Sequence, residues 1–183
     1  MNLVIGVVGM CGSGKSVVTD YLFKKGWKRV YFGGVTIDEL KKRGLEINEE
    51  NERTIRESLR AEYGPDVYAQ RLIPIIQKEL VNSNIVLDGL YSWQEYNLIK
   101  SVLNSNFFIL AIVTNKSIRY ERLMNRTIRP LMPKDAYKRD VAEIENLAKG
   151  GPIAIADYYI VNNGSESDLY FQLEKVIAEC MSN

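Results

Sequence analysis

Eight residues near the start of the chain have the types and the spacing of a phosphate-binding loop. Gly9 to Ser16 read Gly-Met-Cys-Gly-Ser-Gly-Lys-Ser, which matches the P-loop pattern G-x-x-x-x-G-K-[ST]. Glycines let the backbone wrap around a phosphate and point N–H groups at it, and the next helix adds the partial positive charge of its N-terminus. Lys15 would reach the β- and γ-phosphates, and the Ser16 hydroxyl suits Mg²⁺, a hard cation that prefers oxygen. The predicted phosphate-site residues are Gly9, Cys11, Gly12, Ser13, Gly14, Lys15, Ser16 and Val17, among which Cys11 is expected to be a small filler without chemistry.

An acid follows a second apolar run. The segment Ile85-Val86-Leu87-Asp88-Gly89 has the pattern of a strand that ends in a carboxylate. In a parallel sheet, such an acid on a neighbouring strand lies beside the P-loop, where it can hold Mg²⁺ directly or through water. Asp88 is therefore predicted to be catalytic and, with Ser16, to hold the metal. The alternative is a turn aspartate that only stabilises the loop between strand and helix.

Two sets of arginines repeat at the spacing i, i+3, i+7, which places each set on one face of a helix. The first set is Arg53, Arg56 and Arg60; the second is Arg119, Arg122 and Arg126, with Arg129 just beyond it. Arginine binds phosphate oxygens bidentately, and phosphoryl transfer needs neutralisation and positioning more than covalent chemistry. The sets favour a kinase in which Arg122, Arg126 and Arg129 close over the phosphates and act as catalytic residues. The alternative is two solvated faces whose arginines pair with Glu49, Glu52, Glu57 and Glu121.

The elements that must position these residues alternate along the chain. Strand-like runs are expected at 3–8, 29–32, 85–87, 107–113 and 158–161, with helical patterns between them. Helix ends are predicted at Gly26 and at Gly64-Pro65, and helix starts at two capping boxes, Thr36 to Glu39 and Ser92 to Glu95. This alternation predicts an α/β fold with a parallel sheet that is covered by helices on both faces. The segment 127–135, which contains Pro130 and Pro133, is the clearest irregular stretch and a candidate lid.

Composition narrows the function classes. A chain of 183 residues can bury one sizeable core, so a single domain over residues 1–183 is expected. Lys plus Arg is 24 and Asp plus Glu is 23, so no basic excess suggests a nucleic-acid or membrane surface. The chain has no histidine, which excludes histidine general bases and histidine-ligated metals. Cys11 and Cys180 lie far apart, so no structural disulfide is expected and a cytoplasmic location is favoured. The apolar first residues are interpreted as the first strand, not as a signal peptide.

Other P-loop classes fit the sequence less well. A GTPase would carry N-K-x-D after a late strand, but the corresponding run here is Asn115-Lys116-Ser117-Ile118. Ile118 cannot supply the carboxylate that reads guanine, so this run is interpreted as a loop that starts a helix. A motor or an AAA-type ATPase would usually need a longer chain, which disfavours that class too.

The assembled pattern resembles the small P-loop nucleotide kinases, and most closely an adenylate-kinase-related group near dephospho-CoA kinase. The resemblance covers nearly the whole chain. It is carried by the P-loop, by Leu87-Asp88-Gly89, by Tyr120-Glu121-Arg122-Leu123 with the arginines beyond it, and by the run from Ala156 to Gly164. It implies a five-stranded parallel sheet in three layers, an acceptor-binding segment at about 36–71 with Arg56, Arg60 and Arg71 toward the acceptor phosphate, and a lid at about 126–137. It also implies that Asn163 and Gly164 lie near the adenine of ATP, although Asn-Gly is a favourable turn in any case.

The chain departs from the family pattern on the acceptor side. The run Phe32-Gly33-Gly34-Val35-Thr36 lacks the acid or arginine that related kinases often carry after the second strand, and Tyr91 stands where they often place an arginine. We expect a phosphotransferase that depends on ATP and Mg²⁺ and acts on a nucleotide-like small molecule. The alternatives are dephospho-CoA kinase itself and a nucleotide-binding regulator or slow ATPase. No residue is convincing as a general base.

Overall fold

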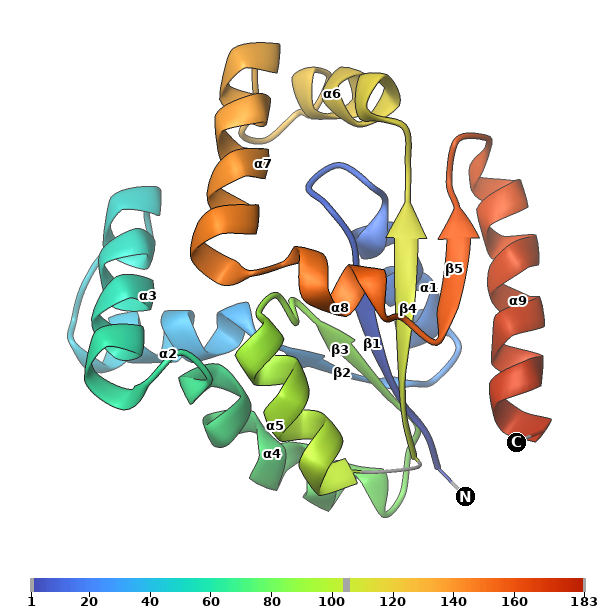
Figure 1. Ribbon diagram of the computed structural model, residues 1–183. Coiled ribbons are helices and arrows are strands. Elements are labelled where there is room, and N and C mark those ends of the chain that lie inside the picture. The colour runs from blue at the N-terminus through green and yellow to red at the C-terminus, as the bar shows by residue number, and fades with distance from the viewer. Residues whose placement is uncertain (1, 104–105, 183) are drawn as a thin grey trace.

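A computed structural model describes residues 2–103 and 106–182 of the chain. Five parallel strands form one sheet in the order β2-β3-β1-β4-β5 (Figure 1). The strands are β1 (Val4–Val8), β2 (Lys28–Tyr31), β3 (Ile85–Asp88), β4 (Phe107–Val113) and β5 (Tyr158–Val161). The five predicted strand runs and the predicted α/β fold with a five-stranded parallel sheet are confirmed, and each strand end lies within one residue of its expected position.

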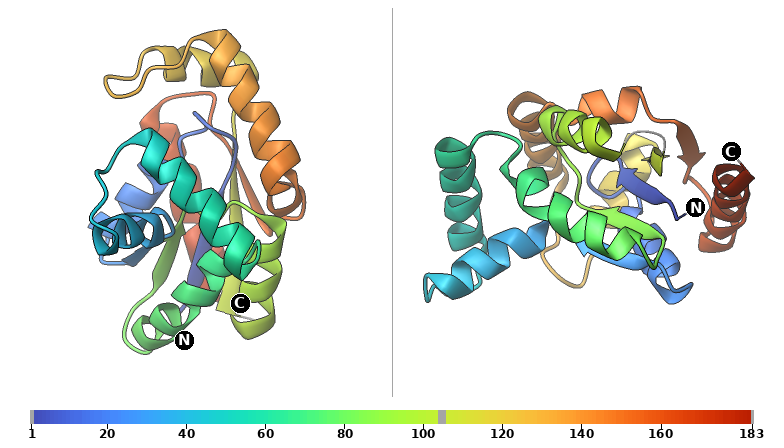
Figure 2. Two further views of the ribbon diagram at one scale, coloured as in Figure 1. Left: turned by 90° about the vertical axis from the view of Figure 1, so that its left-hand side faces the viewer. Right: turned by 90° about the horizontal axis from the view of Figure 1, so that it is seen from below.

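Helices cover both faces of the sheet. They are α1 (Lys15–Lys24), α2 (Gly33–Lys42), α3 (Glu49–Tyr63), α4 (Val67–Leu80), α5 (Trp93–Leu103), α6 (Lys116–Met124), α7 (Pro133–Leu147), α8 (Gly150–Ala154) and α9 (Glu166–Ser182). Side chains of α1 and α9 pack against one face, and those of α2 to α5 pack against the other. Figure 2 shows α9 on one side of the strands and α2 and α3 on the other. This is the expected three-layer arrangement.

The sheet brings the chemistry-bearing loops to one edge. β1 lies at the centre between β3 and β4, and all of its residues are buried, as expected for a strand covered on both faces. The strand order changes direction at β1, so the loop that follows it opens at the switch point where α/β proteins bind ligands. The P-loop is that loop.

Most of the predicted helix boundaries agree with the structure. At α5 the Glu95 amide donates to Ser92 Oγ at 3.0 Å and the Ser92 amide donates to Glu95 Oε2 at 3.1 Å, so this capping box is confirmed. Gly26 and Gly64 follow α1 and α3 with φ of +90° and +98°, a conformation that glycine adopts without strain.

The prediction of a capping box that starts a helix at Thr36 is wrong. Helix α2 begins at Gly33, directly after β2, so Thr36 lies inside the helix. Its side chain is buried and its hydroxyl shares a 2.7 Å hydrogen bond with the Tyr68 hydroxyl on α4. The hydroxyl that the sequence pattern predicted to cap a helix therefore forms a tertiary hydrogen bond to α4 instead.

Helices α6 and α7 form a separate layer above the P-loop (Figure 1). The candidate lid consists of an irregular stretch that ends at Met132 and of the first turn of α7, which begins with Pro133. Arg119 on α6 and Asp140 on α7 form a buried ion pair with N···O distances of 3.0 and 2.7 Å. Arg119 Nη1 also donates to the Cys11 carbonyl at 2.8 Å. This arginine therefore ties both helices to the P-loop.

None of the helices in the described part of the chain combines the length and the apolar character needed to span a bilayer.

We predict that Asp140→Ala destabilises the fold strongly. The Arg119 guanidinium would stay buried without its carboxylate, and breaking a buried pair on one side costs about 3–5 kcal/mol. Urea denaturation measures the loss in the free energy of unfolding. Glu145→Ala, at an exposed position on the same helix, is the control and should change that free energy by no more than about 0.5 kcal/mol. A loss below about 1 kcal/mol for Asp140→Ala would contradict the anchoring role.

Candidate nucleotide-binding site

The backbone of the P-loop requires glycine at three positions. Gly9, Gly12 and Gly14 have φ of +145°, +83° and +100°. A Cβ at Gly9 would lie 2.4 Å from the Ile112 carbonyl oxygen, and one at Gly14 would lie 2.3 Å from Asn162 Nδ2. The loop therefore has no room for side chains there, in agreement with a cradle shaped for a phosphate.

The ends of β4 and β5 hold the loop in place. The Thr114 hydroxyl and the Asn162 amide donate to the Ser13 carbonyl at 3.0 and 2.9 Å. All three residues are buried, and Ser13 Oγ is buried without a partner among the described residues. Thr114 and Asn162 are not among the predicted site residues, although each is a polar residue that directly follows an apolar strand.

Lys15 folds back over its own loop. Its Nζ donates to the Gly9 and Met10 carbonyls at 2.8 and 3.0 Å. Desolvation of the ammonium, reinforced by the charge of Lys149, lowers the pKa of Lys15 to about 7, against the opposing influence of Glu143, Cys11 and Asp88. The ammonium is thus only partly charged at neutral pH, and a bound polyphosphate would restore its full charge.

Ser16 and Asp88 form the predicted metal side of the site. Ser16 is exposed in the first turn of α1, and Thr19, three residues later, has its hydroxyl 3.4 Å from Asp88 Oδ2. Desolvation raises the pKa of Asp88, while Arg29, Thr19 and Lys15 act in the opposite direction. No group of three or more Cys, Asp or Glu residues suited to a metal occurs among the described residues. One hydroxyl and one carboxylate fit a Mg²⁺ ion whose remaining oxygen ligands come from phosphates and water.

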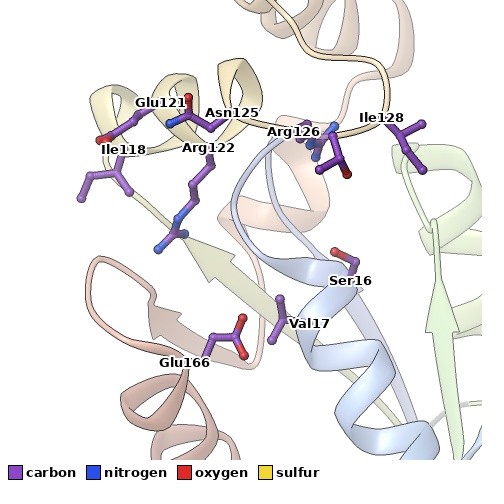
Figure 3. Close-up of a pocket in the computed structure, with 10 residues that line it drawn as sticks. Ser16, Val17, Ile118, Glu121, Arg122, Asn125, Arg126, Ile128 and Glu166 are labelled. Carbon is purple, nitrogen blue, oxygen red and sulfur yellow. The ribbon is translucent and has the colours of Figure 1, made fainter.

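A cavity of about 970 Å³ opens beside the P-loop. Its lining residues are Ser16, Val17, Ile118, Glu121, Arg122, Asn125, Arg126, Thr127, Ile128 and Glu166. Figure 3 shows the Arg122 side chain extending from α6 toward the β5–α9 loop, with the Glu166 carboxylate on the opposite side. Arg122 Nη1 is buried without a partner among the described residues. The volume is sufficient for a nucleotide.

The structure brings two of the three predicted lid arginines to this cavity. Arg122 and Arg126 line it, and Arg126 Nη1 lies 4.0 Å from Cys11 Sγ. Cys11 itself packs with Leu123 and Ala136, which agrees with the filler interpretation. Arg129 points elsewhere, toward α3.

Arg129 joins the lid to α3 through an ion-pair network. Its guanidinium lies 2.8 Å from Glu49 and 3.4 Å from Glu52. Arg56 contacts the same two carboxylates at 3.2 and 3.4 Å. The alternative interpretation of the first arginine set, pairing with Glu49 and Glu52, therefore describes Arg56 in this conformation.

The other two predicted acceptor arginines also have carboxylate partners. Arg60 pairs with the buried Glu95 at 3.3 Å, and Arg71 pairs with Glu39 at 3.3 Å. Arg56, Arg60 and Arg71 therefore each contact a different set of carboxylates.

Asn163 and Gly164 lie in the loop between β5 and α9. Asn163 Oδ1 accepts a 2.9 Å hydrogen bond from the Asn115 amide. Ser165 and Asp168 then form a capping box for α9, in which the Ser165 amide donates to Asp168 Oδ2 at 3.1 Å and the Asp168 amide donates to Ser165 Oγ at 3.2 Å. This loop delivers Glu166, which the sequence analysis missed, to the cavity; Asn163 and Gly164 are not among the cavity's lining residues.

A second group that the sequence analysis missed lies at the end of α7. Lys149 Nζ donates to Glu143 Oε2 at 2.6 Å and lies 4.5 Å from the centre of the Tyr91 ring. Arg139 Nε donates to the other oxygen of Glu143 at 3.2 Å. Ala148, with φ of +48°, reverses the chain after α7. That reversal brings Lys149 to Glu143, a pair whose sequence spacing gives no helical signal.

The chain is similar to several known proteins. A family model described as an AAA domain matches residues 5–148. UPF0200 protein TK1334 of Thermococcus kodakarensis is 33% identical over 184 residues, which cover 98% of this chain and 99% of that protein. UPF0200 protein MJ1399 of Methanocaldococcus jannaschii is 32% identical over 188 residues, which cover 99% of this chain and 92% of that protein.

Solved structures share the fold. TT1252 from Thermus thermophilus has a TM-score of 0.67 and 21% identity, with 97% of each chain covered. A gluconokinase from Sinorhizobium meliloti 1021 has a TM-score of 0.59 and 12% identity, with 97% of this chain and 92% of that one covered. At these identities the likeness shows the fold alone.

The fold and the site together define a P-loop nucleotide-binding protein with a kinase-like fold. The chain belongs to the family of the AAA-domain model and, among the curated proteins, to the UPF0200 family. The resemblance to P-loop kinases is confirmed at the level of the superfamily. The relatives do not confirm the narrower relation to dephospho-CoA kinase.

The lowered pKa of Lys15 predicts proton uptake on nucleotide binding. The free ammonium loses its proton above about pH 7, whereas contact with phosphates raises its pKa and restores the proton. ATP binding at pH 8 should therefore take up close to one proton, and binding at pH 6 much less. Isothermal titration in buffers of different ionisation enthalpy measures this number. The control is Lys15→Arg, whose guanidinium stays protonated throughout; equal uptake by both proteins at pH 8 would refute the assignment.

Proposed function

We propose that the protein is a phosphotransferase that uses ATP and Mg²⁺ and acts on a nucleotide-like small molecule. The observation that carries this proposal is the convergence of Lys15, Arg122 and Arg126 on the P-loop and the cavity beside it. Cations that reach the phosphates from both the loop and the overlying helix suit a transfer that depends on charge stabilisation.

Each residue has a defined part in the proposal. Lys15 stabilises the charge on the β- and γ-phosphates, while Arg122 and Arg126 hold the nucleotide from above. Ser16 and Asp88 hold Mg²⁺, which neutralises phosphate charge when bound. Ile118 lines the cavity and offers no carboxylate to guanine, so adenine is the preferred donor base. Asn163 and Gly164 would border the adenine, as the family resemblance implies.

The acceptor is proposed to bind between α3 and the end of β3. Arg56 and Arg129 meet there at the carboxylates of Glu49 and Glu52. Desolvation raises the pKa of the Tyr31 hydroxyl, and Tyr31 lies close enough to Asp88 and Glu52 for their charges to raise that pKa further. An acceptor phosphate would replace these carboxylates as the partner of the arginines. Arg60 and Arg71 would support this side of the site, and dephospho-CoA is one candidate acceptor.

One observation favours a second function. All three predicted acceptor arginines pair with carboxylates of the chain itself, so the acceptor side presents little free positive charge. A nucleotide-binding regulator or slow ATPase, which needs no acceptor, would tolerate this neutralisation.

The test is ATP consumption in the presence of nucleoside monophosphates, deoxynucleotides and dephospho-CoA, each added separately. At least one acceptor should stimulate turnover, and Lys15→Ala should lower that turnover several hundred-fold, corresponding to about 3–4 kcal/mol of lost transition-state stabilisation. Removing a desolvated ammonium should leave the melting temperature unchanged or slightly raised. Turnover that no acceptor stimulates favours the regulator, and full activity in folded Lys15→Ala contradicts both functions.

Replacement of Asp88 tests the metal side. Asp88→Asn keeps the shape of the side chain and its hydrogen bond to Thr19 but removes the charge that attracts Mg²⁺. Turnover should require a higher Mg²⁺ concentration, whereas ATP binding in excess chelator should be unchanged or tighter. A Mg²⁺ titration of turnover and a binding titration measure the two quantities. Asp135→Asn, an exposed aspartate on α7, is the control; an unaltered Mg²⁺ requirement in Asp88→Asn would count against the role.

A further inference from the structure

Lys149 is the one buried lysine among the described residues, with 2% of its surface exposed. Burial of a lysine is expensive unless its charge is compensated. Its ammonium donates to Glu143 Oε2 at 2.6 Å and lies against the face of Tyr91. The free-energy cost of burying a lysine between α7 and α8 requires an explanation.

Tyr91 links Lys149 to the end of β3. The Tyr91 hydroxyl lies 3.5 Å from the position that a Cβ on Gly89 would occupy, and Gly89 directly follows Asp88. Lys149 lies on the same ring, at 4.5 Å from its centre. Lys149 is not among the residues that line the cavity with Glu166 and Arg122.

The charges around Lys149 are not balanced. Three basic groups, on Lys15, Arg139 and Lys149, face the carboxylates of Glu143 and Asp88, although Lys15 is only partly charged at neutral pH, and Glu143 is shared between Arg139 and Lys149. The Lys149 charge also helps to lower the pKa of Lys15, so the two lysines repel each other. A purely structural ion pair gains little over apolar side chains of the same size. An arriving anion would relieve the repulsion and satisfy both lysines.

We propose that Lys149 binds the terminal phosphoryl group of the nucleotide together with Lys15, and that Glu143 positions its ammonium until that group arrives. The inference rests on the proposed function, since it assumes a nucleoside triphosphate in the P-loop. It makes Lys149 responsible for the difference between a triphosphate and a diphosphate. The end of α7 thereby senses which nucleotide is bound.

The experiment compares ATP and ADP binding by isothermal titration with Mg²⁺ present. The variant is Lys149→Met with Glu143→Gln, which removes the pair without leaving an unpaired buried charge on Glu143. ATP binding should weaken about tenfold, which corresponds to about 1.4 kcal/mol, while ADP binding stays within about twofold of the wild type. Lys116→Met is the matched control, because Lys116 also lies over tyrosine rings but at an exposed position on α6; it should leave both affinities unchanged.

The outcomes separate the two proposals. A wild-type protein that binds neither nucleotide overturns the proposed function and this inference together. A wild-type protein that binds ATP and ADP equally, or a double variant that retains the wild-type preference or weakens both equally, overturns the role of Lys149 alone. Should the double variant not fold, ¹⁵N spectra of the lysine side chains provide the readout, with Lys149→Arg for assignment. The Lys149 Nζ signal should shift with ATP and not with ADP, and an identical response to both overturns the inference.

Discussion

The buried guanidinium of Arg119 is the interaction on which the arrangement of the site depends. It binds the Cys11 carbonyl in the P-loop and the Asp140 carboxylate on α7, and it extends from α6. Three elements that are distant in the sequence are thereby fixed to one planar, always charged group. The bidentate geometry sets direction as well as distance, so α6 and α7 are held above the loop.

The position of α6 and α7 then determines where the remaining charges lie. With Arg119 pointing inward, Arg122 faces the cavity beside Ser16 and Val17, and the chain beyond α6 carries Arg126 past Cys11. At the other end of α7, the reversal at Ala148 returns Lys149 to the neighbourhood of the P-loop. The segment from α6 to Lys149 therefore brings several cations near the loop. Anions are the natural complement of such a site. The pKa of Lys15 is lowered mainly by desolvation of its ammonium and further by the charge of Lys149.

The acceptor side is organised differently, because its arginines already have carboxylate partners. The Glu49 and Glu52 carboxylates lie between Arg56 on α3 and Arg129 in the candidate lid, and so connect these two elements. Exposed ion pairs of this kind contribute little to stability individually. They can exchange for a phosphate at small cost, which makes the network compatible with a lid that opens and closes.

The sequence by itself determined the sheet, the P-loop and the acid at the end of β3. These features follow from local rules: apolar runs form buried strands, glycines with positive φ form the loop, and an acid that ends a neighbouring strand must lie at the same edge of the sheet. Only the tertiary structure decided the roles of individual charged side chains. Arg119, Arg122 and Arg129 have the same chemistry in the sequence, yet one is a buried anchor, one lines the cavity and one joins α3. Thr36 likewise forms a hydrogen bond with Tyr68 on α4 instead of the predicted helix cap, and a chain reversal brings Lys149 into contact with Glu143. The reason is that a long polar side chain takes whichever partner the packing of distant elements brings within reach, and its own neighbours in the sequence do not encode that partner.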